Sequence, residues 1–442
     1  MSRKPNIILI TTDEERYPQH MEGVDLKDML PAHARLKRDG VSYENFFINT
    51  SPCTPSRCSI MTGLYAHQSW MCYLIDLGQP SLNPIFPTYG KALRDELGYQ
   101  TFYFGKWHIS NLDGLSKNNR YHNALENYGF DYFWPGHDSN CKPVEGTMND
   151  GKTATRFAEF IDGRTETDEP FLAVLSLINP HDVFYYPDKV VPKPDKPYPN
   201  IGVPKNFETM EHLKNNKPQC QWKFRDYCKK CLGDMPDAIQ TEQDEEKYKL
   251  YLSHYLWLQK QVDRHIGKAL DALDKNPEVK KDTIVIFTSD HGDYVGSHGM
   301  RGKDCAVYDE ALKVPFHVVD YTGALIKKNE RGTTRRKLGS TIDIFPTMLN
   351  MAASGEEKNR INQKYGFLPG IDLTPNIADP DQPTTDRVLF TYDAAEVMGK
   401  DLSLQSKISQ DSPTHIVCLI DEEYKAAVYN YWYMDIESNP KT

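Results

Sequence analysis

The sequence lacks an apolar run long enough to cross a membrane, and it has no excess of positive charge. Its 52 Lys and Arg residues stand against 62 Asp and Glu residues, so the formal net charge of the 442-residue chain is −10. A nucleic-acid-binding protein normally presents a basic surface, and this balance disfavours such a partner. A membrane-spanning helix needs about 20 apolar residues in succession. We therefore expect neither a nucleic-acid nor a membrane partner.

The N-terminus also lacks a secretory signal pattern. The apolar run Ile7-Ile-Leu-Ile10 follows Met1-Ser-Arg-Lys-Pro-Asn6 directly, and it is far too short for the apolar region of a signal peptide. The run predicts a first strand instead. We expect either a cytoplasmic protein or a periplasmic or secreted protein whose leader has been removed.

The sequence also lacks an even number of cysteines. The nine cysteines cannot all pair within the chain, so a disulfide framework is not the first interpretation. Cys220, Cys228 and Cys231 lie close together in the sequence. Their spacing would suit zinc only with a fourth ligand, for which His212 is the nearby candidate. Ordinary thiols or a local disulfide are the favoured alternatives.

Strand-like apolar runs alternate with helical patterns through most of the chain. Residues 7–10, 171–178 and 283–288 are continuous apolar runs rich in β-branched side chains, which is typical of strands buried on both faces of a parallel sheet. Residues 244–273 carry apolar side chains at steps of three and four, which predicts a helix with one apolar stripe. The pattern predicts an α/β protein.

Two segments depart from this alternation. Residues 185–237 are dense in Pro and Lys and show no sustained periodicity, so we interpret them as a long insertion over the sheet. Residues 388–392, 415–420 and 424–431 predict short strands, the last two joined by a tight turn. These strands suggest a small antiparallel unit. The insertion could line a substrate pocket with Tyr185, Tyr186, Trp222 and Arg225.

The strongest motif is Cys53-Thr-Pro55-Ser-Arg57, followed by Thr62-Gly63. It resembles the signature of the formylglycine-dependent sulfatases, which begins Cys-x-Pro-Ser-Arg and continues toward a Thr-Gly. In that family a dedicated formylglycine-generating enzyme reads Cys-x-Pro-x-Arg and oxidises the cysteine to formylglycine. The resemblance implies that Cys53 becomes the nucleophile and that the maturation enzyme is a partner. It also implies that Arg57 fixes the formylglycine loop and the metal carboxylates.

Charged residues follow two of the predicted strands. Asp13-Glu14 comes directly after the first strand, and Asp290-His291 follows the strand at 283–288. The carboxyl ends of parallel strands are where open α/β folds bind ligands, and carboxylate oxygens suit a hard cation. Sulfatases are similar at both places. The resemblance implies one divalent cation, Ca²⁺ first, with Mg²⁺ or Mn²⁺ as alternatives, bound by Asp13, Glu14, Cys53, Asp290 and His291.

Glu14 departs from the family pattern, which usually shows two aspartates at this place. Glutamate is one methylene longer, so Glu14 is the ligand that can bind differently or yield to water.

Three further segments resemble sulfatase elements. Gly105-Lys106-Trp107-His108, Asn179-Pro180-His181-Asp182 and Gly302-Lys303 lie in the family's order between the first strand and Pro315. The resemblance implies that Lys106, His181 and Lys303 hold the sulfonate oxygens. It implies that His181 or Lys303 protonates the departing alcohol, while His108 is the base that lets the hydrated aldehyde expel sulfate.

The resemblance also implies the fold and the division of the chain. We expect an alkaline-phosphatase-like, mainly parallel mixed sheet flanked by helices. Residues 1–380 would form the catalytic domain, with 185–237 as an insertion, and residues 381–442 a small antiparallel subdomain. The segment from Tyr433 to Pro440 resembles one after which many sulfatases continue, so the last element is expected to be trimmed or completed by another subunit in a homo-oligomer.

The predicted activity is hydrolysis of a small-molecule or glycan sulfate ester. Two alternatives stay open. A phosphonate monoester or phosphodiester hydrolase can use the same formylglycine and metal. A chain whose Cys53 stays unmodified would be a non-catalytic protein that binds sulfated ligands.

Overall fold

The structure is a computed structural model of the whole chain. It describes residues 3–112, 124–135, 143–187, 192, 194–393 and 415–430, with the side chains of residues 227 and 230–232 left out. Residues 431–442, which include the segment from Tyr433 to Pro440, lie outside this description. Among the described helices, none combines the length and the apolar character that a membrane span requires.

The described strands form two sheets. Their bounds are β1 Asn6–Asp13, β2 Val41–Phe47, β3 Gln100–Gly105, β4 Tyr132–Pro135, β5 Phe171–Pro180, β6 Thr283–Ser289, β7 Phe316–Asp320, β8 Thr334–Ser340, β9 Val388–Asp393, β10 His415–Ile420 and β11 Lys425–Asn430. The larger sheet has eight strands in the order β4-β3-β5-β1-β6-β7-β2-β8. Every neighbouring pair is parallel except the two that involve β7. The predicted mixed, mainly parallel sheet is therefore confirmed.

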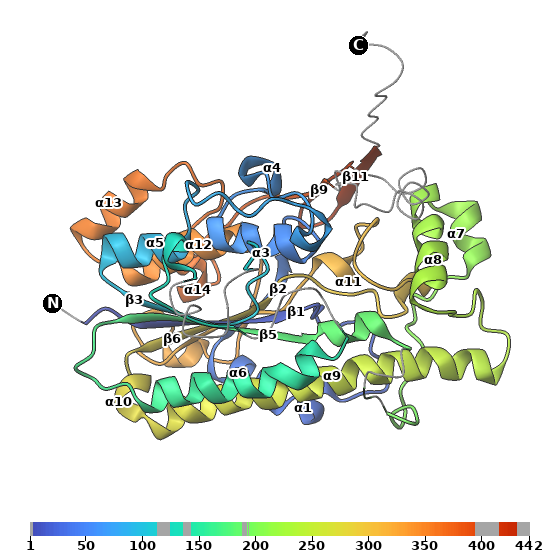
Figure 1. Cartoon of the computed structure of the whole chain (residues 1–442), viewed down its shortest axis with the longest axis horizontal. Coiled ribbons are helices and arrows are strands. Elements are labelled where there is room, and N and C mark those ends of the chain that lie inside the picture. The colour runs from blue at the N-terminus through green and yellow to red at the C-terminus, as the bar shows by residue number, and fades with distance from the viewer. Residues whose placement is uncertain are drawn as a thin grey trace, which may run out of the picture.

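Helices cover both faces of the large sheet (Figure 1). Their bounds are α1 Leu26–Met29, α2 Pro31–Asp39, α3 Cys53–Thr62, α4 Ala66–Ser69, α5 Tyr89–Lys91, α6 Glu145–Asp162, α7 Met210–Asn216, α8 Gln219–Leu232, α9 Glu242–Lys275, α10 Pro277–Lys280, α11 Asp309–Leu312, α12 Ile344–Ala352, α13 Glu356–Lys364 and α14 Thr374–Ala378. The helices α6 and α9 lie together below the sheet in Figure 1, and α3, α5 and α12 lie above it.

Alternation along β1 sends side chains into two separate cores. Ile7 and Leu9 pack in the core that α3 and α12 close, whereas Ile8 and Ile10 pack in the core that α6 and α9 close. Successive side chains of a strand point to opposite faces, so a strand covered on both sides must be apolar throughout. This is why β1 is a continuous apolar run, and the predicted helix at 244–273 is the central part of α9.

The insertion at 185–237 differs from the prediction. It contains two helices, α7 and α8, and its residues Phe224 and Cys228 pack on Tyr294 and Met300. The apolar spacing in α8 is interrupted by charged residues, so its sequence gave no sustained helical stripe. The insertion thus packs against the chain segment that follows β6, beside one end of the sheet (Figure 1).

The C-terminal strands form a second, antiparallel sheet in the order β11-β10-β9, as predicted. Its buried face, which includes Phe390 and Ile416, joins the same core as Leu9 of the large sheet. The small sheet therefore shares a core with the large one. The division of the chain at residue 380 stays a prediction.

Candidate active site

Four adjacent strands of the large sheet end at one edge, and an ionisable side chain stands at the end of each. Lys106 follows β3, His181 follows β5, Asp13 ends β1 and Asp290 follows β6. The four strands are neighbours in the order β3-β5-β1-β6 and run parallel. Parallel strands bring their carboxyl ends to the same edge, so residues far apart in the sequence meet here.

Gly105 is required for the approach of Lys106 to this edge. It has φ = 104°, and a Cβ at this position would lie 1.9 Å from the carbonyl oxygen of Ser176 on β5. Only glycine tolerates both the backbone conformation and the contact. Lys106 therefore enters the site from a strand end that lies tight against β5.

Cys53 is the first residue of α3, and all ten residues of this helix are buried. Its Sγ lies 3.6 Å from Oδ1 of Asp13 and 3.2 Å from Nε2 of His291. The N-terminus of a helix carries partial positive charge and free N–H groups, so an oxygen at position 53 would sit in a field that favours negative charge.

Asp13, Cys53, Asp290 and His291 form a buried group, which we call the central cluster. One ligand atom from each lies within 4.8 Å of the others. Asp13, Glu14 and His181 form a second such group, which shares only Asp13 with the first. Glu14 thus lies beside the central cluster, and the structure does not include it in the same four-residue group.

Arg57 joins the two carboxylates of the central cluster. Its Nε donates to Oδ2 of Asp290 at 2.8 Å and its Nη2 to Oδ2 of Asp13 at 3.0 Å, while Nζ of Lys106 lies 2.8 Å from the same Asp13 oxygen. Burial alone would raise the pKa of Asp13, but neighbouring cations, Lys106 foremost, outweigh it and hold this pKa well below its usual value. Asp13 is therefore ionised and available as an oxygen ligand.

Glu14 faces a lysine and a histidine. Its Oε2 lies 3.0 Å from Nζ of Lys303 and 3.8 Å from Nε2 of His181. Lys303 Nζ also lies 3.4 Å from Cys53 Sγ. Lys303 and His181 thus converge on the side of position 53 where an anionic group would be held. Glu14 itself has φ = 72°, an uncommon conformation for a residue with a side chain that is often found at functional sites.

Burial dominates the protonation of the other groups at this edge. It holds the pKa of His181 well below its usual value and also lowers the pKa of His291. Burial raises the pKa of Glu14 well above its usual value, although Lys303 opposes the shift. For Lys303, burial would lower the pKa, but the negative charge around it, from Cys53 and Glu14 first, raises its pKa well above normal.

His108 is buried and lies beside an acid that the sequence analysis did not single out. Its Nε2 is 2.7 Å from Oδ2 of Asp76, and its backbone has φ = 58°. A carboxylate at this distance fixes the orientation of the ring.

The residues present suit a hard divalent cation. Asp13 and Asp290 offer ionisable oxygens, which Ca²⁺, Mg²⁺ and Mn²⁺ prefer, and His291 adds a nitrogen. Oε1 of Glu14 is buried without a hydrogen-bond partner among the described residues. A buried oxygen left in this state could bind a cation or accept a hydrogen bond from water bound to one.

Several residues that the sequence analysis missed hold these groups in place. Ser176 accepts a hydrogen bond from Arg57 at 2.9 Å, and Ser56 donates to the main chain of Asp290. Asp150 accepts from the N–H groups of Ile178 and Asn179 at 2.7 and 2.8 Å. Only Ser56 lies inside a recognisable motif, so no pattern in the sequence could identify the other two.

Asp182 has a similar role next to His181. Its carboxylate accepts from the N–H groups of Gly146 and Thr147 at 3.3 and 2.8 Å, at the start of α6. Asp182 and Asp150 thus tie the end of β5 to α6 from both sides. Its place in Asn179-Pro180-His181-Asp182 was the available signal.

Two of the four residues suggested as pocket lining have structural roles instead. Arg225 is buried and donates to main-chain oxygens of Glu208 and Pro236, and Tyr186 packs against Tyr251. Tyr185 does lie beside the site, with its ring 6.1 Å from that of His181. Trp222 is half-buried, and its contacts with Lys214 and Lys223 lie within the insertion.

The thiols of the insertion form no disulfide and no metal group that the structure describes. Neither Cys220 nor Cys228 is part of a disulfide, and His212 lies 3.0 Å from Glu208. The side chain of Cys231 is outside the description. For the first two cysteines, the interpretation as ordinary thiols agrees with the structure.

Comparison with known proteins agrees with this site. The family model for sulfatases matches residues 5–354. The chain is 29% identical over 417 residues to an ulvan-active sulfatase of Formosa agariphila, covering 90% of this chain and 69% of that protein. It is 25% identical over 398 residues to a Δ4,5-hexuronate-2-O-sulfatase of Bacteroides thetaiotaomicron, covering 85% and 72%.

Solved structures share the fold. A 2-O GAG sulfatase has a TM-score of 0.66 at 21% identity, with 97% of this chain and 83% of that one covered. The phosphonate monoester hydrolase of Agrobacterium radiobacter has the same TM-score and identity, with 96% and 87% covered. The family match extends over most of the chain and includes every charged residue of the site. The chain therefore belongs to the sulfatase family of hydrolases, within the alkaline-phosphatase-like superfamily.

Proposed function

We propose that this chain hydrolyses a sulfate ester to an alcohol and inorganic sulfate, with Cys53 converted to formylglycine and one divalent cation bound at the central cluster. The observation that carries the proposal is the approach of Cys53 to Asp13, His291 and Lys303 within 3.2–3.6 Å. The proposed nucleophile, a carboxylate that would bind the metal ion and a positively charged side chain for the substrate thus meet at one buried point.

Asp13, Asp290 and His291, together with position 53, would hold the cation. When bound, the cation lowers the pKa of an oxygen acid beside it, and the aldehyde of formylglycine supplies a hydrated carbonyl with one hydroxyl to attack sulfur and one to expel sulfate. Arg57 keeps both carboxylates in position by bridging them. Glu14 is a further oxygen donor next to this group.

Lys303, His181 and Lys106 bind the sulfuryl group. Their side chains are nearly fully buried, so their interactions with an anion act in a medium where they are stronger than in water. Lys303 and His181 are the two groups that can donate a proton to the departing alcohol oxygen. His108, oriented by Asp76, is the proposed base in the release of sulfate.

Phosphonate and phosphodiester hydrolysis is the rival activity, because the solved structure of a phosphonate monoester hydrolase has the same fold as this chain. Two lysines and a histidine at this edge, Lys303, Lys106 and His181, favour a compact sulfate group that carries its charge on several oxygens. Parallel assays on nitrophenyl sulfate, a nitrophenyl phosphodiester and a nitrophenyl phosphonate test this preference. A turnover of the sulfate below that of both others would overturn it.

Conversion of Cys53 is tested separately. The protein is expressed with and without a formylglycine-generating enzyme, and the tryptic peptide of residues 39–57 is weighed. Replacement of CH₂SH by CHO, a two-electron oxidation of the side-chain carbon, lowers the mass by about 18 Da. Activity should appear only in the sample with the lighter peptide. A thiol that stays unmodified beside the maturation enzyme would make the chain a binding protein for sulfated ligands.

The substrate is proposed to be a glycan or small-molecule sulfate ester, in keeping with relatives named for ulvan and for hexuronate sulfate. A screen of sulfated monosaccharides, choline sulfate and aryl sulfates with the converted protein identifies the class.

A further inference from the structure

A cavity of about 590 Å³ lies beside the segment that follows β1. It is enclosed by α2, by that segment, and by residues from β2, β7 and α9. Leu30, Ala34, Pro315 and the ring of Tyr43 make most of its wall apolar. No residue of the central cluster lines it. Pockets with apolar walls and a few polar groups are the usual sites for small ligands.

The cavity is positively charged in a protein whose net charge is −10. Its charged lining consists of Arg16, Lys27, His33, Lys37 and Arg38 against the single acid Glu15. Glu15 is already paired with His33, whose Nε2 lies 2.8 Å from Oε1, and His33 also contacts Asp263. The acid therefore does not cancel the charge of the lysines at the rim.

Two of these cations are available for a ligand. Arg16 donates to the main-chain oxygen of Tyr294, and Arg38 is paired with Asp39. Lys27 and Lys37 form no ion pair with any carboxylate of the described residues. Both side chains are exposed at the rim of the cavity, where they can attract an anion.

The inner wall contains buried polar atoms that lack a partner. The hydroxyl of Tyr43 and Oε1 of Gln259 are buried with no hydrogen-bond partner among the described residues. A hydroxyl can donate, and a carboxamide can turn to present its NH₂ group. Buried polar groups are normally satisfied, so this wall has hydrogen-bonding capacity left for a ligand or its water.

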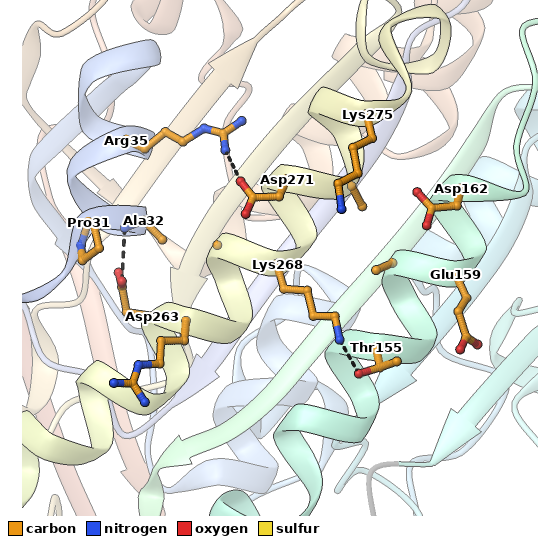
Figure 2. A pocket seen from close by; sticks show the side chains of 14 residues that line it. Pro31, Ala32, Arg35, Thr155, Glu159, Asp162, Asp263, Lys268, Asp271 and Lys275 are labelled. Atoms are coloured by element: carbon orange, nitrogen blue, oxygen red, sulfur yellow. Dashed lines mark hydrogen bonds and ion pairs between the residues drawn. The ribbon is translucent and has the colours of Figure 1, made fainter.

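A second cleft, between α2, α6 and α9, lacks these properties (Figure 2). Its lining has as many acids as bases: Arg35 is 3.0 Å from Asp271, and Lys268 donates to the hydroxyl of Thr155 at 2.6 Å. Balanced charge does not select a ligand of either sign. The two clefts that α2 lines therefore differ in charge, and of these two only the cavity with Lys27 and Lys37 at its rim suits an anion.

We propose that the cavity beside α2 is a second ligand site, which takes a small amphipathic anion: an apolar body that carries one carboxylate, sulfate or phosphate group. The apolar body packs on Leu30, Ala34 and Pro315. The anionic group faces Lys27 and Lys37 at the rim.

The probe is 8-anilinonaphthalene-1-sulfonate, titrated into the full chain and followed by its fluorescence. We expect one saturable site. Ala34→Phe, which fills the cavity, should abolish it, and Lys27→Glu/Lys37→Glu should weaken it by about tenfold or more because attraction becomes repulsion. Lys247→Glu, the same change at an exposed position of α9 outside the cavity, should bind like the wild type. Circular dichroism checks that each variant is folded.

Two results overturn the proposal. One is equal binding by the wild type and the double lysine variant, which would show that the probe attaches to apolar surface elsewhere. The other is loss of binding in Lys303→Met with retention in the double lysine variant, which would place the sulfonate in the active site. If Ala34→Phe does not fold, the double lysine variant decides alone.

Discussion

Nζ of Lys303 lies 3.4 Å from Sγ of Cys53, although 250 positions separate the two residues in the chain. Lys303 belongs to the segment on which the insertion packs, and Cys53 is the first residue of the buried helix α3. This contact joins the proposed nucleophile to a positive charge that an anionic substrate can use.

Replacement of Lys303 by methionine should remove that charge while keeping the length of the side chain. We expect kcat/KM on nitrophenyl sulfate to fall by about 100- to 1000-fold, as for loss of one donor to a developing anion. Lys313→Met is a matched control, because Lys313 is also buried and lies over the ring of Tyr17, away from Cys53. Equal losses in both variants would contradict a direct role for Lys303.

Arg57→Lys should weaken cation binding without removing positive charge. The planar guanidinium donates to Asp290 and Asp13 from two different nitrogens, a geometry that the single nitrogen of a lysine does not reproduce. We expect the affinity for Ca²⁺ to fall by about 10- to 100-fold, measured by calorimetry on wild type and variant both expressed without the maturation enzyme, so that residue 53 is the same in each. An unchanged affinity would show that the bridge does not position the carboxylates.

Removal of the cation should lower the stability of the fold. A ligand at 100 times its Kd contributes about 2.7 kcal/mol to the free energy of unfolding. We therefore expect EDTA to lower Tm and added Ca²⁺ to restore it. In Asp290→Asn, which weakens the site, the EDTA effect should nearly vanish. A wild-type Tm that is the same with EDTA and with Ca²⁺ would argue against a cation at the central cluster.

Asp182→Asn should affect catalysis through the position of His181. Asn has one acceptor oxygen in place of two, so one of the N–H groups of Gly146 and Thr147 loses its partner, at a cost of about 1–3 kcal/mol. We expect kcat to fall more than KM changes. Asp168→Asn is the control, because Asp168 likewise accepts from a backbone N–H and a threonine hydroxyl but lies in an exposed turn. A fall in Tm with unchanged kcat would make Asp182 purely structural.

His33 should make stability depend on alkaline pH. Burial opposes its charge, but Glu15 and Asp263 outweigh burial and raise its pKa to about 10. Because the folded pKa exceeds the unfolded one, the stabilisation is complete below about pH 6.5 and is lost as the pH rises through about 10. The difference in unfolding free energy between wild type and His33→Gln should shrink across this window, by roughly 1.4 kcal/mol per pH unit at most. A constant difference would mean that folding does not raise the pKa of His33.

The main sheet could be predicted in part. Residues 7–10, 171–178 and 283–288 all proved to be strands, because burial on both faces forces a continuous apolar sequence. The edge strands could not be recognised: β8 is half exposed and carries Arg335, Arg336 and Lys337. Helix α8 was missed for the same reason, since its residues pack on a neighbouring loop and show no uniform stripe.

The sequence by itself determined the chemistry that is available: a Cys-x-Pro-x-Arg motif, acids after two apolar strands, and basic residues in short ordered segments. Only the tertiary structure decided which of them meet. It places Glu14 with Lys303 and His181 beside the central cluster, and it pairs His108 with Asp76. The physical reason is that strand order and loop paths set distances between residues far apart in the chain, whereas local sequence sets only which strand or helix each residue belongs to.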